Sequence, residues 1–165
     1  MSLTNDFKDA LSSWATGVSV VTTRAGGLVY GITVSSFTSL SLDPPLVLIC
    51  VAHKNRLSGM IRDARSFAVS LLSAEQSAAS TYFAKSGREP LPSFPDVDEE
   101  PTTTGLPVIK GAMAFVACEL FNEMTVGDHN IVIGRVIEAA ASSDREPLLY
   151  HRRRYRTLDS GRAAD

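Results

Sequence analysis

The stretch from Thr33 to Pro45, TVSSFTSLSLDPP, places hydroxyl side chains at six of its first nine positions. With Gly31 just before it, the stretch offers hydrogen-bonding groups and a position where a polar organic cofactor could approach the backbone closely. The same alcohols would equally satisfy the solvent-facing side of an edge strand. Taken alone, the stretch therefore leaves a ligand-binding strand and a wet edge strand both open.

Three other segments carry polar groups that could take part in chemistry. They are CVAHKNRL after an apolar run, the turn Gly127-Asp128-His129, and the basic and aromatic tail YHRRRY. The chain has none of the usual Gly-rich dinucleotide, P-loop, nucleophile-elbow, zinc-protease or CxxC motifs. Its three histidines lack partners at metal-ligand spacing, so we expect no metal site. Without any functional role, the turn would be an ordinary hairpin turn with an exposed histidine, and the tail would be a solvated surface segment.

Length and composition indicate one globular domain over residues 1–165. The chain is 44% apolar and 21% charged, and its net charge is −2, which disfavours general binding to nucleic acid or to an acidic membrane. We find no signal-peptide pattern and no apolar run long enough to span a membrane, and we expect a cytoplasmic protein. Cys50 and Cys118 lie in apolar runs, which predicts buried free thiols.

Hydrophobic periodicity predicts a mostly β fold in which helices lie at the periphery. Because the strands cluster in hairpins, an antiparallel barrel fits better than a doubly wound parallel sheet. The uninterrupted run LVLICV predicts a strand buried on both faces. The proline-rich segment 85–107 predicts a long irregular loop, either solvated or acting as a lid or dimer contact, and 159–165 a disordered tail. The expected helices are 4–16, 56–64 and 74–84, and the expected strands are 18–23, 28–36, 46–51, 67–72, 113–124 and 130–140.

The order of these motifs resembles the flavin reductase-like family of FMN-binding split barrels. The resemblance runs from about Phe7 to Leu158 through GVSVVTT, YGITVSSFTSLSLDPPLVLICV, GDH before IVIGRV, and PLLYHRRRY. It implies a single-domain Greek-key split β-barrel that reduces FMN or FAD with NADH or NADPH. It also implies a homodimer with flavin at the subunit boundary, and a flavin-dependent monooxygenase that receives the reduced flavin.

The resemblance also assigns site residues. His129 would lie on the nicotinamide side of the flavin and is the catalytic candidate. Where relatives have a Ser-Thr pair for the phosphate, this chain has Arg56-Leu57, and Leu57 has no side-chain donor. Phe83 would border the flavin or belong to the core. The full set of cofactor-binding candidates is Gly31, Thr33, Val34, Ser35, Ser36, Cys50, Val51, Ala52, Asn55, Arg56, Phe83, Arg153 and Tyr155.

Two alternatives within the same fold stay open at this point. One is a flavoprotein that keeps FMN tightly bound and reduces another acceptor, such as a corrinoid or a nitro compound. The other is a non-catalytic flavin-binding protein. A barrel that binds nucleic acid is disfavoured, because the central strands are hydroxylated and apolar rather than basic and aromatic.

Overall fold

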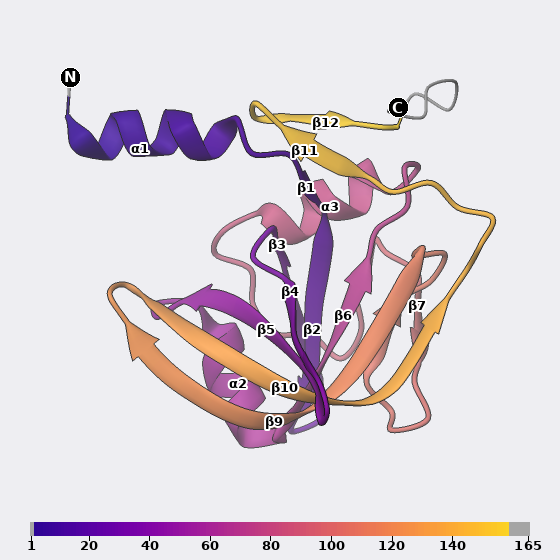
Figure 1. The fold of residues 1–165 in the computed structure, drawn as a ribbon. Coiled ribbons are helices and arrows are strands. Elements are labelled where there is room, and N and C mark those ends of the chain that lie inside the picture. Colours follow the sequence, from indigo (N-terminus) through magenta and orange to yellow (C-terminus); the bar gives the residue numbers. More distant parts are fainter. Residues whose placement is uncertain (1, 159–165) are drawn as a thin grey trace.

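A curved, seven-stranded antiparallel sheet organises the chain, which a computed structural model describes over residues 2–158 (Figure 1). The order of strands across the sheet is β3-β2-β6-β9-β10-β5-β4. The remaining strands form a small sheet β1-β11-β12 and the pair β7-β8. The helices are α1 Leu3–Ser12, α2 Arg56–Ala64 and α3 Ser77–Ala84; the strands are β1 Thr16–Gly17, β2 Ser19–Ala25, β3 Leu28–Val34, β4 Thr38–Leu42, β5 Pro45–Ala52, β6 Ser66–Leu71, β7 Glu99–Pro101, β8 Pro107–Ile109, β9 Ala114–Val126, β10 His129–Ala141, β11 Leu149–His151 and β12 Arg154–Arg156.

The hairpin β2-β3 forms as the sequence predicts. Its two-residue loop is Gly26-Gly27, and both residues have positive φ, 57° and 80°. Glycine adopts this region without a steric penalty, and such loops match the twist of the strands they join. The mostly β class with three helices in one domain is confirmed.

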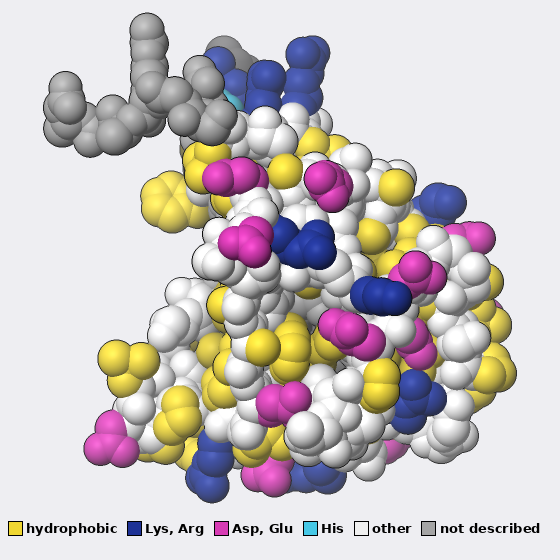
Figure 2. Space-filling model, turned by 90° about the vertical axis from the view of Figure 1, so that its right-hand side faces the viewer, with side chains coloured by type: hydrophobic (Ala, Val, Ile, Leu, Met, Phe, Trp, Pro, Cys, Tyr) yellow, Lys and Arg dark blue, Asp and Glu magenta, His cyan; other side chains and the backbone are white. Residues whose placement is uncertain are grey.

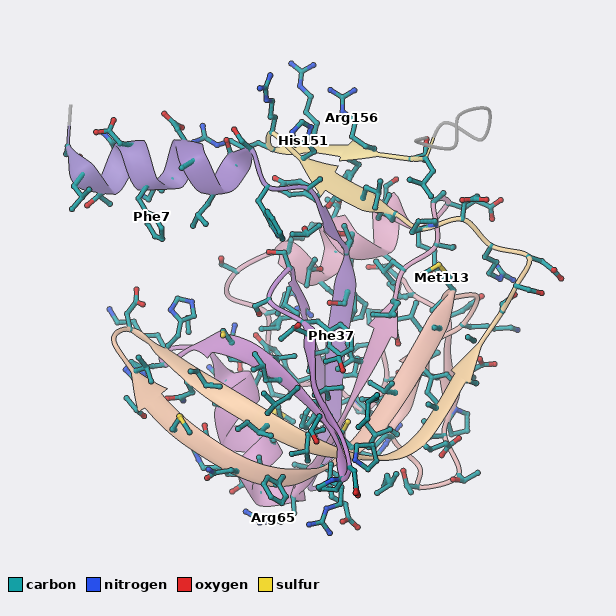
Figure 3. All side chains as sticks on the ribbon, viewed as in Figure 1. Phe7, Phe37, Arg65, Met113, His151 and Arg156 are labelled. Carbon is teal, nitrogen blue, oxygen red and sulfur yellow. The ribbon has the colours of Figure 1, made fainter. Side chains whose placement is uncertain are left out.

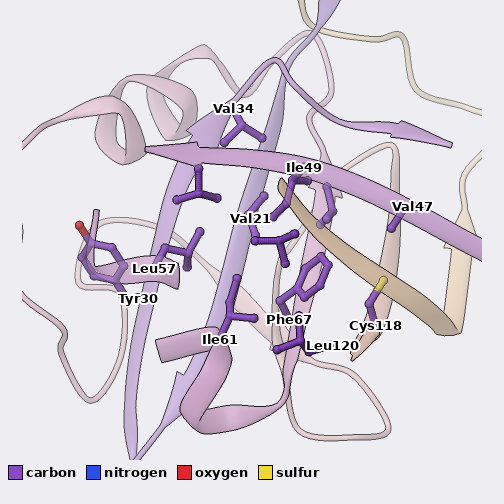
Figure 4. Packing of buried hydrophobic residues seen from close by; sticks show 13 residues of the cluster. Val21, Tyr30, Val34, Val47, Ile49, Leu57, Ile61, Phe67, Cys118 and Leu120 are labelled. Carbon is purple, nitrogen blue, oxygen red and sulfur yellow. The ribbon is translucent and has the colours of Figure 1, made fainter. Parts of the chain in front are cut away.

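The interior of the curved sheet holds the main core, into which α2 inserts Leu57 and Ile61 (Figure 4). Phe67 of β6 and Val21 of β2 pack there, and both are fully buried. A second core lies between β2, α3 and the segment after α3, and it is built around Phe83 and Phe94, whose rings meet edge to face at 4.9 Å. Strands β2 and β3 therefore contribute to both cores.

The long strand LVLICV differs from its expected burial on both faces. In β5 the residues alternate between buried and half-buried, and Leu46, Leu48 and Cys50 form the less covered side. The strand lies between β10 and β4, one place from the edge of the sheet. Both cysteines are free, and burial in apolar surroundings raises the pKa of the Cys118 thiol to about 12.

Two element boundaries differ from the sequence prediction. Helix α1 begins after Ser2 and ends at Ser12, whereas periodicity extended it to Thr16. The hydroxyls of Ser12 and Ser13 donate to the carbonyl of Asp9. Thr16, which the prediction placed in the helix, instead belongs to β1, which pairs with β11. The other difference is β4: the sequence predicts no strand between 28–36 and 46–51, but Thr38–Leu42 pairs with β5.

The segment 85–107 contains one regular element, the three-residue strand β7, which pairs with β8. The predicted capping box of α3 forms in half, because the Gln76 side chain accepts from the Ser73 N–H while the Ser73 hydroxyl has no bonding partner among the described residues. The expected tail 159–165 lies outside the described residues. Across residues 2–158, no helix is long and apolar enough to cross a membrane.

Gly134 of β10 is required by close packing, which generates a stability prediction. A Cβ at this position would lie 2.5 Å from Phe67 Cζ and 2.7 Å from Cys118 Cβ. We expect Gly134→Ala to lower the free energy of unfolding by about 1–3 kcal/mol through overpacking. The matched control is Gly59→Ala in α2, where the added methyl meets only the Arg62 side chain at 3.9 Å. Urea unfolding of both variants checks this, and equal midpoints would contradict it.

Candidate active site

Strand β3 forms one edge of the large sheet, so the backbone groups on its outer side form no hydrogen bonds with another strand of that sheet. In an antiparallel strand, the N–H and C=O of alternate residues point to the same edge. On this free edge, the backbone N–H and C=O of Val29 form hydrogen bonds with the backbone of Leu91, and the carbonyl of Gly31 accepts from Arg88. By the same alternation, Thr33 presents its backbone N–H and C=O to the free edge.

Three hollows follow one another along this edge of β3. A cationic hollow of about 420 Å³ and a smaller one of about 230 Å³ both include Thr33 and Ala84 in their walls. The smaller one shares Val18 and Ser35 with a third hollow of about 560 Å³. Figure 2 shows the molecule notched on one side, with hydrophobic side chains gathered along the notch. The three hollows adjoin one another through these shared wall residues, and together they are called the cleft.

The cationic hollow lies between the start of α2 and the segment that follows α3. Four basic side chains line it, and none of its described lining residues is acidic: the basic ones are Lys54, Arg56, Lys85 and Arg88. Asn55 caps α2 by accepting from the Leu57 N–H at 2.9 Å, while the Leu57 side chain is fully buried in the core. The position that departs from the Ser-Thr pair of relatives is therefore a core residue here, and Arg56 is the residue that faces the hollow.

Arg88 builds the wall of this hollow and was missed by sequence reasoning. Its guanidinium donates to the carbonyls of Gly31 and Phe83 and lies 5.0–5.3 Å from the ring centroids of Tyr30, Tyr82 and Phe83. Arginine suits this place because its planar group stacks on rings while donating in two directions. Besides the nearby Lys85 carbonyl at 3.3 Å, its partners come from β3 and α3, so no local pattern marks this residue.

The middle of the cleft is held by a chain of hydrogen bonds between three elements. The Thr33 hydroxyl donates to the Ser80 carbonyl at 2.7 Å, and the Ser80 and Tyr155 hydroxyls lie 2.8 Å apart. Tyr155 packs against Tyr150 with ring centroids 5.5 Å apart. These contacts tie β3, α3 and β12 together and place two aromatic rings in the wall of the smaller hollow.

The third hollow combines hydroxyls with apolar side chains. Ser35 is exposed at its wall, and Phe37, Met113 and Trp14 lie around it. The Ser36 hydroxyl accepts from the Cys50 N–H at 3.0 Å and donates to the Cys50 carbonyl at 3.1 Å. This hydroxyl therefore links the extension of β3 to β5, and of the two serines it is Ser35 that offers a free hydroxyl to a ligand.

His129 lies at the tip of the β9-β10 hairpin, outside the walls of the three hollows. It pairs with Ala52 across the strands, so both side chains stand on the same face of the sheet, and Ala52 lines the cationic hollow. Its Nδ1 is 2.6 Å from an oxygen of Asp128, and this hydrogen bond lowers the pKa of the exposed Asp128 carboxyl. The bond fixes the orientation of the imidazole.

The structure places the other candidates as follows. Val34 and Ala52 line the cleft, and Val51 points its side chain into the main core. Gly31 lacks room for a side chain, since a Cβ would lie 3.0 Å from the Val21 carbonyl and 3.1 Å from the Phe83 ring. Phe83 is a core residue that also reaches the wall of the cationic hollow, and its contact with a flavin stays a prediction.

Arg153 is the candidate that stands apart from the cleft. Its side chain forms an exposed ion pair of 2.8 Å with Asp9 of α1. Among residues 2–158 there is also no group of three His, Cys, Asp or Glu side chains placed to hold a metal ion.

The chain is similar to known flavin reductases over most of its length. The family model for the flavin reductase like domain matches residues 11–159. FMN reductase (NADH) SmoA of Agrobacterium fabrum is 40% identical over 87% of this chain and 80% of its own length. The reductase component of 4-hydroxyphenylacetate 3-monooxygenase of Thermus thermophilus is 39% identical over 92% of this chain and 95% of its own.

Among solved structures, the NADH:FAD oxidoreductase SgcE6 of Streptomyces globisporus C-1027, in complex with NAD and FAD fragments, superimposes with a TM-score of 0.89. It is 35% identical and covers 96% of this chain and 94% of that chain. The chain belongs to the flavin reductase-like family, and the family resemblance read from the sequence is confirmed.

The Arg88 cluster generates a prediction about stability. We expect Arg88→Lys to lower the free energy of unfolding by about 1–3 kcal/mol, because a lysine cannot serve two carbonyls and stack on the rings at once. Arg62→Lys is the matched control: the Arg62 side chain of α2 is 54% exposed and pairs with Glu123 of β9, and this change should alter the free energy of unfolding by less than about 0.5 kcal/mol. Thermal and urea unfolding measure both, and an unchanged midpoint for Arg88→Lys would rule out the assigned role.

Proposed function

We propose that the cleft along β3 binds FMN or FAD, with the phosphate end in the cationic hollow and the ring toward Ser35. The observation that carries this proposal is the order of groups along one cleft. Four basic side chains lie at one end, the Thr33 backbone and the Tyr150-Tyr155 pair in the middle, and hydroxyl and apolar groups at the other. Arg56, Lys54 and Lys85 suit phosphate oxygens, and backbone groups suit the polar edge of a flavin ring.

The chain is a flavin reductase that uses a nicotinamide as hydride donor, as its family and relatives establish. When bound, the flavin supplies the chemistry by accepting a hydride from the reduced nicotinamide. The residues of the chain bind and orient the two ring systems, because hydride transfer needs close stacking and no protein nucleophile. Since similar reductases are named as NADH-dependent, we propose NADH as the preferred donor.

His129 and Asp128 belong to this proposal as a positioning pair. The imidazole stands on the same face of the sheet as Ala52, and Asp128 holds its Nδ1. This leaves Nε2 directed away from Asp128, so it can bond a polar group of the nicotinamide nucleotide. The role is to orient the donor.

We further propose that the sheet is the family's split barrel and that the chain forms a homodimer. The two ends of the sheet approach through the Ser36-Cys50 bonds without closing into a ladder. The apolar side of α1 is uncovered in the single chain, where Phe7 is 59% exposed (Figure 3). Trp14, which follows the helix, is 73% exposed. A second copy of the chain would cover this face and add a wall to the third hollow, which includes Trp14.

The partner of the reduced flavin is proposed from the relatives. Several are named as reductase components of monooxygenases, including those acting on 4-hydroxyphenylacetate and 4-nitrophenol. We therefore propose that this chain supplies reduced flavin to a flavin-dependent monooxygenase. A permanently FMN-bound enzyme with another acceptor predicts yellow protein after dialysis, and a non-catalytic carrier predicts no turnover. The cytoplasmic location stays a prediction.

Steady-state oxidation of NADH and NADPH, with riboflavin, FMN and FAD supplied in turn, tests the function. We expect turnover that needs added flavin and a higher kcat/KM with NADH than with NADPH. Protein that oxidises neither nucleotide with any of the three flavins would overturn the proposal.

Substitution of His129 separates nicotinamide binding from flavin binding. We expect His129→Ala to raise the KM for NADH about tenfold, in line with the loss of one hydrogen bond to a charged or polar group, and to leave the Kd for FMN within twofold. His151→Ala, in the tail strand β11, is the control. A larger effect on flavin than on NADH would reverse the assigned role.

A further inference from the structure

The exposed ion pair between Arg56 and Glu89 joins a residue that lines the cationic hollow to one outside its walls, and folding alone does not explain it. Arg56 is the first residue of α2, and Glu89 follows Arg88 in the segment after α3. Their side chains meet at 2.8 Å between Nη2 and Oε1, with 57% and 64% of each side chain exposed. Exposed pairs of this kind contribute little to stability, so its place at the hollow is the feature to explain.

Among the cations that line the hollow, Arg56 is the one that forms an ion pair with a carboxylate within residues 2–158. The guanidinium of Arg88 already donates to three carbonyls, those of Gly31, Phe83 and Lys85, and lies near three rings. Arg56 is therefore the planar, two-point donor at this end of the cleft that an incoming phosphate can recruit. To recruit it, the phosphate must displace Glu89.

We infer that Glu89 competes with the phosphate of the flavin for Arg56 and thereby weakens the binding of phosphorylated flavins. This inference rests on the proposed function and names a further residue that sets cofactor affinity. A carboxylate and a phosphate use the same face of a guanidinium, and the phosphate carries more charge, so the exchange proceeds toward the ligand. The carboxylate is then left beside a bound anion, which shortens the lifetime of the complex.

Weaker binding of the phosphorylated flavin suits a reductase whose reduced flavin is transferred to another protein. A site with four cations and no competing carboxylate would hold a phosphorylated flavin longer. Glu89 is on the surface and is outside the walls of the hollow, so it acts through Arg56 and not by touching the ring.

The test compares equilibrium binding of FMN with that of riboflavin, which lacks the phosphate. Quenching of flavin fluorescence gives both Kd values for the wild-type chain, Glu89→Gln, Arg56→Gln and the double variant. We expect Glu89→Gln to lower the Kd for FMN about two- to fivefold, the range expected for an exposed ion pair, and to leave that for riboflavin unchanged. Arg56→Gln should raise the Kd for FMN, and adding Glu89→Gln to it should have less than half of the effect seen in the wild-type chain.

The control for charge alone is Glu123→Gln, which removes a carboxylate from the Arg62–Glu123 pair on the other side of α2 and should leave both Kd values unchanged. An unchanged FMN Kd in Glu89→Gln, or an effect that is fully retained without Arg56, would overturn the inference while leaving the reductase function intact. If the wild-type chain bound neither flavin, the proposed function itself would fail. Unfolding midpoints of the variants, expected within about 2 °C of the wild type, check that each remains folded.

Discussion

The free edge of β3 is the constraint on which the site depends. A strand at the end of a sheet leaves every second residue with unpaired backbone groups, and these must find partners when they are shielded from water. Leu91 and Arg88 satisfy the first part of this edge, at Val29 and Gly31. From Thr33 onward the edge opens into the cleft, so the fold delivers backbone donors and acceptors to the place where a planar polar ring would bind.

The side chains around this edge are of two kinds: some are fixed by several contacts, and one is exposed and can exchange its partner for a ligand. Arg88 is enclosed by aromatic rings and carbonyls, and the Thr33, Ser80 and Tyr155 hydrogen bonds fasten α3 and β12 to β3. Arg56, in contrast, is exposed and joined to a carboxylate that an anion can displace. A chain of net charge −2 thus gathers cations at one end of a cleft without becoming basic overall. We propose that such a site recognises a phosphate and still lets the flavin exchange.

Much of the fold could be predicted because its signals are local. The Gly26-Gly27 turn, the apolar periodicity of α2 over 56–64 and the paired strands β9 and β10 depend on near neighbours in the sequence. The errors came where a distant partner decides. Thr38–Leu42 has the composition of a turn, but β5 supplies the hydrogen bonds that make it a strand. Strand β5 reads as fully buried, but its position beside the edge leaves one face half-covered.

The same division holds for the candidate site. The sequence by itself determined the family, the hydroxyl-rich strand and the replacement of the Ser-Thr pair by Arg56-Leu57, since these are properties of residue type and order. Only the tertiary structure decided that the Ser36 hydroxyl forms hydrogen bonds with the Cys50 backbone, that Leu57 belongs to the core, and that Arg88 forms part of the cleft wall. The physical reason is that a hydroxyl or a guanidinium can serve several partners. Which one it serves depends on the backbone that the fold places within hydrogen-bonding distance.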